Sequence, residues 1–463
     1  MIFSSIQFIL FFLAVLGGLA LLRGRNTARK VLLLAASWYF YAYWDWRFLS
    51  LILVSTLMDF WIGSQLSVTA DPAMRRRLLQ GSLVVNLGLL GVFKYLNFFI
   101  DSATPLLNTL GLHPGSLDIV LPVGISFYTF QTLSYTIDVY SKRMEAHDSL
   151  LDFALFVGFF PQLVAGPIVR ASHFLPQLES YRPLTSQNMY EGFQRFSYGL
   201  FKKVFLADRL AIFSDHVFAN AGLYDCTSTW LAALAYTMQI YFDFSGYSDM
   251  AIGAARVLGY DLGENFDFPY LSKSPREFWQ RWHISLSTWV RDYLYIPLGG
   301  SRRGPVRNFV NLMVTWLLCG LWHGAAWTFV AWGGLHGAAL GLNRLAPKGG
   351  TDGKGRAFLA WVGTMFFVVV GWVLFRSADF SQAALMLRQM FLPEPGIAWY
   401  YPFVPFVLVA SAVVFALEAK GVWKQLFLPE APAWYSPALL LSLIGLAVTF
   451  RPEGFNPFIY FQF

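Results

Sequence analysis

The amino-acid sequence predicts an all-α, polytopic integral membrane protein with about eleven transmembrane helices and further re-entrant or amphipathic helices. Hydrophobic residues make up 56% of the chain and charged residues only 13%, whereas soluble domains carry about 25% charged residues. Aromatic residues reach 18%, which fits Phe facing lipid and Trp and Tyr at the membrane interfaces. In addition, the thirty-six residues between Arg307 and Arg344 include no Asp, Glu, Lys or Arg.

The N-terminal part of the chain is expected to cross the membrane four times. The first span lacks the basic start and the cleavage site of a signal peptide, so it predicts a retained membrane helix. The positive-inside rule places the basic loops 23–30 and 75–77 in the cytoplasm and the N-terminus outside. Residues 101–118 are expected to form an extracytoplasmic loop. The four predicted spans are residues 2–22, 31–43, 49–66 and 83–100.

Two later segments, residues 121–131 and 159–170, are apolar but interrupted by Pro and Gly and unusually rich in polar side chains. Non-helical backbone at membrane depth is tolerated only where protein or a water-filled cavity shields it. These two segments are therefore predicted to be walls of an internal cavity. The polar stretch after them, residues 171–192, is expected to be cytoplasmic.

Residues 193–218 and 231–252 are the next apolar runs, and both contain charged residues. The first is interrupted by Lys202 and Lys203, and the second holds two carboxylates six residues apart. A carboxylate at membrane depth usually pairs with a cation, for which Arg281 and Arg291 are candidates, or lines a polar cavity. We expect structural pairing rather than direct catalysis for Asp138, Asp243, Asp249 and Asp292.

Residues 273–307 form the most charged part of the chain. Ser274 as N-cap, Pro275 at the first helical position and Glu277 two residues later predict a strong helix start. Tryptophan and charged residues alternate too densely for an ordinary span. We expect an amphipathic or re-entrant helix that packs into the protein from the cytoplasmic face.

The charge-free stretch between Arg307 and Arg344 is too long for one span. As a helix it would run about 54 Å, against a hydrocarbon thickness of about 30 Å. The backbone must turn, kink or cross twice, and the glycines that allow this are Gly320, Gly324, Gly333 and Gly334. After a basic cytoplasmic loop at 348–356, the last expected spans are residues 357–375, 405–417 and 439–450, followed by an aromatic end at 456–463.

His323 and His336 are the titratable side chains within the charge-free stretch, and an ionisable side chain at membrane depth is a functional-site hypothesis by default. On one continuous helix the two rings would face apart and lie about 20 Å from each other, so a shared metal site is not expected. His336 is expected to be structural. Cys319 would share a helical face with His323, but a small buried residue between helices is the better interpretation.

Other classes of function are disfavoured by the residues. The net charge of +7 comes from short loops, without the polybasic patch that nucleic-acid binding requires. Two cysteines, Cys226 and Cys319, provide neither a disulfide framework nor metal-ligand spacing. Residues 299–303, Gly-Gly-Ser-Arg-Arg, are a weak candidate for contact with phosphates through Arg302 and Arg303, and a cytoplasmic turn is the simpler interpretation.

Several long strings resemble the membrane-bound O-acyltransferase family, over nearly the whole chain from about residue 30. They are PVGISFYTFQTLSY (122–135), PQLVAGPI (161–168), RWHISLSTWVRDYLYIPLGGSR (281–302) and Trp322-His323-Gly324. Within the family they are most similar to the bacterial branch that acetylates alginate or cellulose, and less so to the branch that D-alanylates cell-surface polymers.

The resemblance implies one helical domain over residues 1–463 surrounding a transmembrane tunnel, with a catalytic core at about 120–345 and C-terminal helices at 357–463. His323 matches the family's invariant histidine. His283 matches a second polar position and is expected to orient the acyl group or to donate to the oxyanion. A neutral imidazole suits the general base of acyl transfer, the role expected of His323.

The implied reaction takes an acetyl group from a cytoplasmic donor, expected to be acetyl-CoA, across the bacterial inner membrane. Periplasmic acetyltransferase partners of the AlgJ or AlgX kind would place it on an exopolysaccharide. No permanently bound cofactor and no metal are expected. The residues do not decide whether the acceptor polymer is alginate, cellulose or another glycan, nor whether a covalent acyl-enzyme forms.

Two competing hypotheses have no chemistry of their own. A transporter or flippase for a lipid-linked sugar or acyl carrier would also have broken spans and buried polar groups. The nearly uncharged neighbourhood of His323 argues against it, because such a carrier would need a substrate-sized set of paired charges. A scaffold for periplasmic enzymes predicts that acetylation survives the substitution His323→Ala.

Overall fold

The computed structural model describes residues 1–164, 166–345, 353–429, 433–452 and 458–459. Within these residues the fold is all-helical, and the extended pairing is limited to one isolated bridge between Tyr224 and Ile397. The all-α class predicted from composition is therefore confirmed for this part of the chain. The helices form two compact units: residues 1–192 with 251–263, and residues 193–250 with 264–463. The single-domain organisation stays a prediction.

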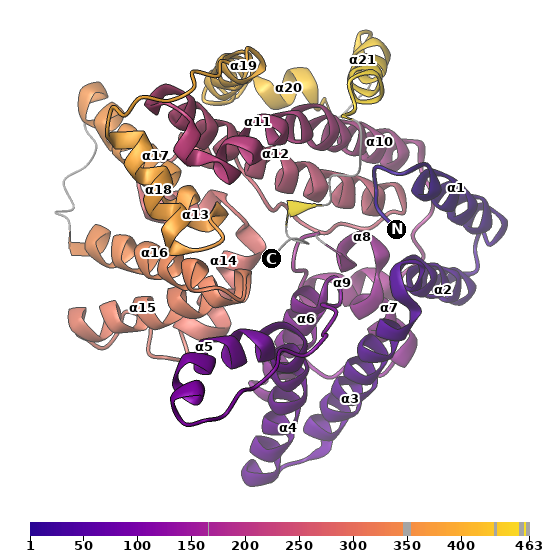
Figure 1. Ribbon diagram of the computed structural model, residues 1–463. Coiled ribbons are helices and arrows are strands. Elements are labelled where there is room, and N and C mark those ends of the chain that lie inside the picture. The colour runs from indigo at the N-terminus through magenta and orange to yellow at the C-terminus, as the bar shows by residue number, and fades with distance from the viewer. Residues whose placement is uncertain (165, 346–352, 430–432, 453–457, 460–463) are drawn as a thin grey trace. The chain divides into compact units, whose positions relative to one another are not determined.

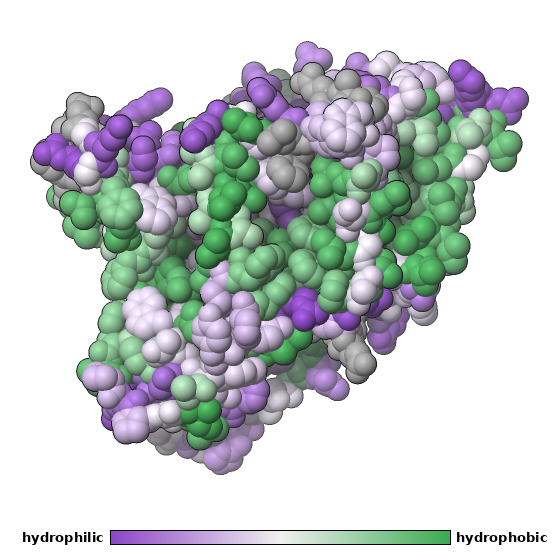
Figure 2. Space-filling model, turned by 90° about the horizontal axis from the view of Figure 1, so that it is seen from above, coloured by the Kyte–Doolittle hydropathy of each residue, from purple (hydrophilic) through white to green (hydrophobic). Residues whose placement is uncertain are grey.

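Three helical segments in the described residues are long and apolar enough to cross a membrane: Asn26–Val68, Pro72–Thr109 and Lys354–Arg376. Shorter apolar helices cover Ile6–Leu21, Phe403–Glu418 and Ser436–Thr449. Broad areas of hydrophobic side chains cover the face seen in Figure 2, as expected of a protein in contact with lipid. The protein is a multi-pass membrane protein, and the number of eleven spans and their tunnel stay predictions.

The first unit consists mainly of the N-terminal helices (Figure 1), and the structure differs from prediction in the loop expected at 101–118. The helix expected to end at residue 100 continues through a π-helical segment, Gly91–Tyr95, and ends at Thr109, so half of the predicted loop 101–118 is helical. The polar stretch 171–192 contains a nine-residue helix and the start of another. The helices are α1 (Ile6–Leu21), α2 (Asn26–Asp45), α3 (Leu49–Val68), α4 (Pro72–Leu90), α5 (Leu96–Thr109), α6 (Ile125–Tyr140), α7 (Leu150–Gly158), α8 (Phe160–Leu163) and α9 (Ala171–Glu179).

Both broken segments of this unit are broken in the structure. Gly124, immediately before α6, has a φ of 77°, and Phe159 leaves the helical region between α7 and α8 with a ψ of 110°. A Cβ atom on Gly124 would lie 2.5 Å from the carbonyl oxygen of Leu163. The two breaks therefore touch each other, and only glycine fits at the contact both sterically and conformationally. Their role as cavity walls stays a prediction.

A buried carboxylate joins three helices of the first unit. Asp59 on α3 is fully buried and accepts hydrogen bonds from Ser82 Oγ (2.6 Å) and Asn86 Nδ2 (2.8 Å) on α4. It also accepts one from Thr136 Oγ1 (3.2 Å) on α6. The polar groups thus satisfy one another inside the unit, where a buried donor or acceptor without a partner is costly.

We expect Asp59→Ala to destabilise the protein by about 2–3 kcal/mol, because it leaves buried donors without their acceptor. Asp59→Asn should cost less, since the amide keeps one acceptor oxygen and the hydroxyls can rotate. Thermal unfolding in detergent measures both. Ser64→Ala is the matched control on the same helix, because the Ser64 hydroxyl donates to the Phe60 carbonyl oxygen of its own helix. Equal melting temperatures for Asp59→Ala and the control would contradict the role of Asp59.

The second unit begins within α10 (Ser186–Leu200), which continues through a π-helical segment, Phe201–Ala207, into α11 (Asp208–Ala219). A long helix, α12 (Cys226–Val257), carries both predicted intramembrane carboxylates. The remaining helices are α13 (Pro275–Arg281), α14 (Ile284–Val290), α15 (Gly304–His323), α16 (Trp327–Leu345), α17 (Lys354–Arg376), α18 (Phe380–Phe391), α19 (Phe403–Glu418), α20 (Trp423–Phe427) and α21 (Ser436–Thr449).

The charge-free stretch turns back on itself, as its length required. It forms α15 and α16, which are separated by three non-helical residues, Gly324 to Ala326, and which pack against each other (Figure 1). A Cβ atom on Gly320 would collide with the carbonyl oxygen of Phe329, and one on Gly333 with that of Trp316. These two glycines let the backbones touch, which is how membrane helices commonly associate. The hairpin fixes the position of His323 at its turn.

Candidate functional site

His323 is the last residue of α15, and its side chain is buried. Three aromatic rings surround the imidazole, with centroid distances of 5.0 Å to Trp322, 5.1 Å to Trp332 and 5.5 Å to Phe375. Trp332 is supplied by α16 and Phe375 by α17. The sequence predicted a histidine in an uncharged environment, and the structure surrounds it with a wall of aromatic side chains.

His283 lies at a break in the segment that was predicted to be one helix. The predicted start is correct, because Ser274 Oγ accepts a hydrogen bond from the Glu277 N–H at 3.1 Å and Pro275 opens α13. The continuous helix is wrong: α13 ends at Arg281, and His283 adopts left-handed dihedrals, φ 44° and ψ 56°, before α14. A residue with a side chain is strained there. The buried His283 ring lies edge-on to Phe244 on α12, at 4.7 Å.

The two candidate histidines meet at one tryptophan. The Trp322 ring lies 6.2 Å from the His283 ring and 5.0 Å from the His323 ring, measured between centroids. Residues forty positions apart in the sequence thus contact the same side chain inside the second unit. Their assignment as catalytic residues stays a prediction, but the structure brings them into one neighbourhood.

His336 is held in place by a hydrogen bond. The Trp279 indole N–H donates to His336 Nδ1 at 3.1 Å, which supports its predicted structural role. The geometric reason for separating it from His323 was wrong, because the chain turns between them and both rings contact Trp332, at 4.6 Å and 5.1 Å. Across the residues that the structure describes, no group of three His, Cys, Asp or Glu side chains is arranged to hold a metal ion.

Cys319 is buried on α15, one turn before His323. Its place in the tightly packed α15–α16 hairpin fits the interpretation of a small residue between helices. Cys226 lies in the first turn of α12, where its thiol donates to the Met390 carbonyl oxygen. Both cysteines are free.

The four carboxylates singled out in the sequence are paired. Asp243 Oδ1 lies 2.5 Å from Lys203 Nζ, and Asp249 lies 2.6 Å from both Lys202 Nζ and Arg195 Nε. Of the two expected partners, Arg291 pairs with Asp292, whereas Arg281 pairs with Glu277 and Asp267. Asp138 pairs with Arg143 at 3.4 Å.

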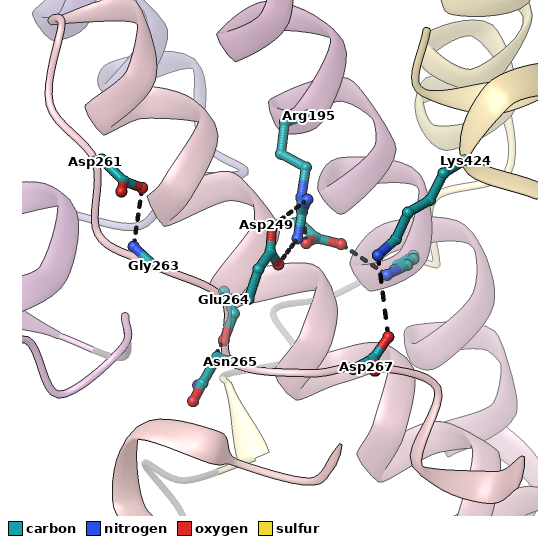
Figure 3. A network of polar contacts seen from close by, with 10 residues as sticks. Arg195, Asp249, Asp261, Gly263, Glu264, Asn265, Asp267 and Lys424 are labelled. Atoms are coloured by element: carbon teal, nitrogen blue, oxygen red, sulfur yellow. Dashed lines mark hydrogen bonds and ion pairs between the residues drawn. The ribbon is translucent and has the colours of Figure 1, made fainter. Parts of the chain in front are cut away.

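Arg195 holds the loop that follows α12. Its guanidinium binds Asp249 on one side and both carboxylate oxygens of Glu264 on the other, at 3.0 and 2.6 Å (Figure 3). Glu264 immediately precedes Asn265, which contacts His283 through a hydrogen bond of 3.1 Å. An ion-pair network that runs from the buried Asp249 through Arg195 to the exposed Glu264 therefore holds the backbone next to one of the candidate histidines.

Arg302 and Arg303 line a cavity of about 480 Å³, together with Arg291, Tyr295 and the backbone of Gly299 and Gly300. Both glycines have a positive φ, 115° and 54°, which folds residues 296–300 into a tight turn. The cavity presents three guanidinium groups, of which Arg291 is paired with Asp292. Such a site suits a polyanion, since guanidinium groups bind phosphate well.

Sequence reasoning missed two contributors to this neighbourhood. Asn265 carried no signal, because polar residues are common in loops and its partner is eighteen residues away. The C-terminal residues Phe458 and Ile459 are buried. The Phe458 ring packs on Tyr247 and Phe244, and the Ile459 N–H donates to Asp243 Oδ2 at 2.7 Å. The rest of the predicted aromatic end lies outside the described residues, as does most of the predicted loop 348–356.

Comparison with known proteins gives a consistent result. The model of the membrane-bound O-acyltransferase family matches residues 144–347. The chain is 47% identical to the probable alginate O-acetylase AlgI of Pseudomonas putida, over the full length of both chains. It is also 47% identical to the protein of that name from Pseudomonas aeruginosa, over 84% of this chain and 75% of the relative.

A more distant relative is the peptidoglycan O-acetyltransferase of Helicobacter pylori, 37% identical over 78% of this chain and 73% of the relative. All three relatives transfer acetyl groups according to their names, and the full-length match leaves no part of the chain unaccounted for. The chain therefore belongs to the membrane-bound O-acyltransferase family and is an O-acetyltransferase.

Proposed function

We propose that the protein moves an acetyl group from acetyl-CoA at the cytoplasmic side across the inner membrane, for O-acetylation of an exopolysaccharide. The observation that carries this proposal is the convergence of two buried histidines, His283 and His323, on Trp322. Alginate is the first candidate polymer, because the full-length relative is named as an alginate O-acetylase. Cellulose is the alternative polymer, and periplasmic partners of the AlgJ or AlgX kind would complete the transfer.

In the proposed reaction His323 is the general base. It takes the proton of an acceptor hydroxyl, whose oxygen forms a C–O bond to the acetyl carbonyl carbon. The C–S bond of the thioester then breaks, and the departing thiolate takes the proton from the imidazolium. The products are an acetyl ester and free CoA. The aromatic wall around His323 keeps water from competing as acceptor, as closed acyl-transfer sites require.

The cavity beside Arg302 and Arg303 is the proposed place for the donor's phosphates. A CoA carries several phosphate charges, and three arginines line this cavity. Asn311 of α15 donates to the Gly300 carbonyl oxygen at 3.0 Å. This bond ties the turn of the cavity to the helix that ends in His323, so a donor held there is connected to the candidate base by one rigid element.

Charge reversal tests the donor site. We expect Arg302→Glu with Arg303→Glu to raise the KM for acetyl-CoA at least about 100-fold with a much smaller change in kcat, because two lost charge-assisted contacts are worth about 1.5–3 kcal/mol each and about 1.4 kcal/mol is a factor of ten. Steady-state kinetics with purified protein in lipid nanodiscs measure both constants. Arg388→Glu is the control, since Arg388 is an exposed arginine of α18 whose partner is Glu394. An unchanged KM for acetyl-CoA in the double variant would contradict the assignment of this cavity as the donor site.

The proposed function as a whole is tested by acetylation of the exported polymer in cells. Cells with His323→Ala or His283→Ala should export polymer that lacks acetyl groups, with the protein at its normal level in the membrane. Normal acetylation by a stable His323→Ala protein would favour the scaffold hypothesis, because a scaffold needs no catalytic histidine.

A further inference from the structure

Asn265 is fully buried beside His283 and uses both ends of its amide. Its oxygen lies 3.1 Å from His283 Nδ1 and accepts hydrogen bonds from the Ser285 N–H at 3.3 Å and the Ser285 hydroxyl at 2.8 Å. Its nitrogen donates to Ser248 Oγ on α12 at 3.2 Å. Asn265 therefore connects the imidazole to both the following helix and α12.

These contacts determine which way the amide faces. A hydroxyl could donate or accept, but the backbone N–H of Ser285 can only donate. The atom facing it must therefore be the amide oxygen, and the same oxygen faces His283 Nδ1. Two acceptors at 3.1 Å would repel each other, so Nδ1 must carry the hydrogen. In the neutral ring the lone pair is then on Nε2.

The backbone around Asn265 is held as firmly as its side chain. The Ile284 N–H donates to the Asn265 carbonyl oxygen, and the Asp267 N–H donates to that of Arg281, both at 2.9 Å. These two bonds clamp the loop 265–267 against the left-handed turn at His283. Arg195 pairs both with the buried Asp249 on α12 and with the exposed Glu264 of the loop (Figure 3), so a shift of the loop along α12 would break the pair between Arg195 and Glu264.

We propose that Asn265 is a positioning residue: it holds His283 in one orientation, with its proton on Nδ1 and its lone pair on Nε2. A neutral ring in this state cannot donate from Nε2, which favours the orienting role expected for His283 over the oxyanion-donor role. The strained backbone of His283 fits this assignment, because such strain persists only where the surroundings enforce it, commonly at functional sites. The catalytic role of this tautomer rests on the proposed function, whereas the assignment of the tautomer rests only on the hydrogen bonds of Asn265.

The tautomer is measured directly by solid-state NMR of the protein in lipid bilayers, with nitrogen-labelled histidine. The His283 signals are assigned by their loss in His283→Asn. We expect a protonated Nδ1 and an unprotonated Nε2 in the wild-type protein, and a shift towards protonated Nε2 in Asn265→Leu, which keeps the size of the side chain but has no acceptor. A protonated Nε2 in the wild-type neutral ring would overturn the assignment.

The positioning role is measured by the pH dependence of acetyl transfer. Asn265→Leu should lose at least about ten-fold in kcat, the lower end of what a mispositioned acid–base group costs. Asn265→Asp keeps an acceptor at Nδ1, so it should recover most of that loss. Its negative charge should also move the acidic limb of the pH profile upward by about 1–2 units, because a carboxylate favours the imidazolium.

Gln239→Leu is the matched control, because Gln239 is also a buried amide of the second unit and bonds to Ser214. It should lose stability without changing the pH profile or the His283 signals. An unchanged pH profile in both Asn265 variants would overturn the positioning role. Normal activity of His323→Ala would instead reject the proposed function, while leaving the NMR result on Asn265 and His283 unaffected.

Discussion

Replacing His323 with alanine is expected to lower the rate of acetyl transfer by about 10²–10⁴-fold, the usual contribution of a general base. His323 is the buried imidazole at the turn between α15 and α16, enclosed by Trp322, Trp332 and Phe375. Alanine cannot take the proton of the acceptor hydroxyl, and the aromatic surroundings supply no substitute base. The measurement is the acetyl content of exported polymer, normalised to the amount of protein in the membrane.

His336→Gln is the control for this experiment. His336 lies in the same hairpin, is equally buried and contacts the same Trp332 ring. Glutamine keeps an acceptor within reach of the Trp279 N–H, so acetylation should fall only in proportion to protein level. If the two substitutions reduced acetylation equally per molecule of protein, His323 would have no catalytic role beyond packing.

Replacing Lys203 with methionine is expected to destabilise the protein by about 3–5 kcal/mol, since it breaks a buried ion pair from one side. Lys203 Nζ lies 2.5 Å from Asp243 Oδ1 and 2.8 Å from Asp208 Oδ1. Without the ammonium group, two carboxylates would face each other in a buried place. Thermal unfolding in detergent should show a lower Tm, and the level of protein in cells should drop.

A second substitution separates charge from packing. Lys203→Met combined with Asp243→Asn should recover part of the lost stability, because the amide removes one of the two uncompensated charges and can still accept from the Ile459 N–H. Lys424→Met is the control. Lys424 is an exposed lysine 4.0 Å from Asp267 (Figure 3), and exposed pairs contribute about 0–1 kcal/mol. Equal Tm values for Lys203→Met and Lys424→Met would show that the buried pair is not a stabilising element.

The parts of the fold that follow from composition and length were predictable. A charge-free stretch longer than the membrane had to turn, and it does so between His323 and Trp327. The broken segments around Gly124 and Phe159 also appear where Pro and Gly interrupt the sequence. These predictions depend on local sequence and on the thickness of a bilayer, so they need no knowledge of tertiary contacts.

The parts that depend on long-range contacts were not predictable. The helix expected through His283 is broken where loop 265–267 forms hydrogen bonds with the backbone of Arg281 and Ile284. No residue pattern within 274–292 predicts these bonds. The cations for Asp243 and Asp249 come from α10 and the π-helical segment that follows it, not from Arg281 or Arg291. The prediction that His336 and His323 face apart assumed one continuous helix. The turn between α15 and α16 makes that assumption wrong.

The residues of the candidate site also fall into those that the sequence could identify and those that it could not. His323 could be singled out because an ionisable residue is rare in such a stretch. His283 was selected by family resemblance, and the structure adds that it contacts Trp322 together with His323. Asn265 could be found only from its hydrogen bonds, since its residue type and position in a loop are ordinary.

The central claim is that His323 takes part in transferring the acetyl group and does not merely support the fold. The most direct test is consumption of radiolabelled acetyl-CoA by purified protein in bilayers, supplied with an acceptor polymer and its periplasmic partner protein. The wild-type protein should release free CoA and label the polymer. His323→Ala should bind acetyl-CoA with unchanged affinity but release no CoA above background, whereas turnover of this variant at the wild-type rate would contradict the mechanism.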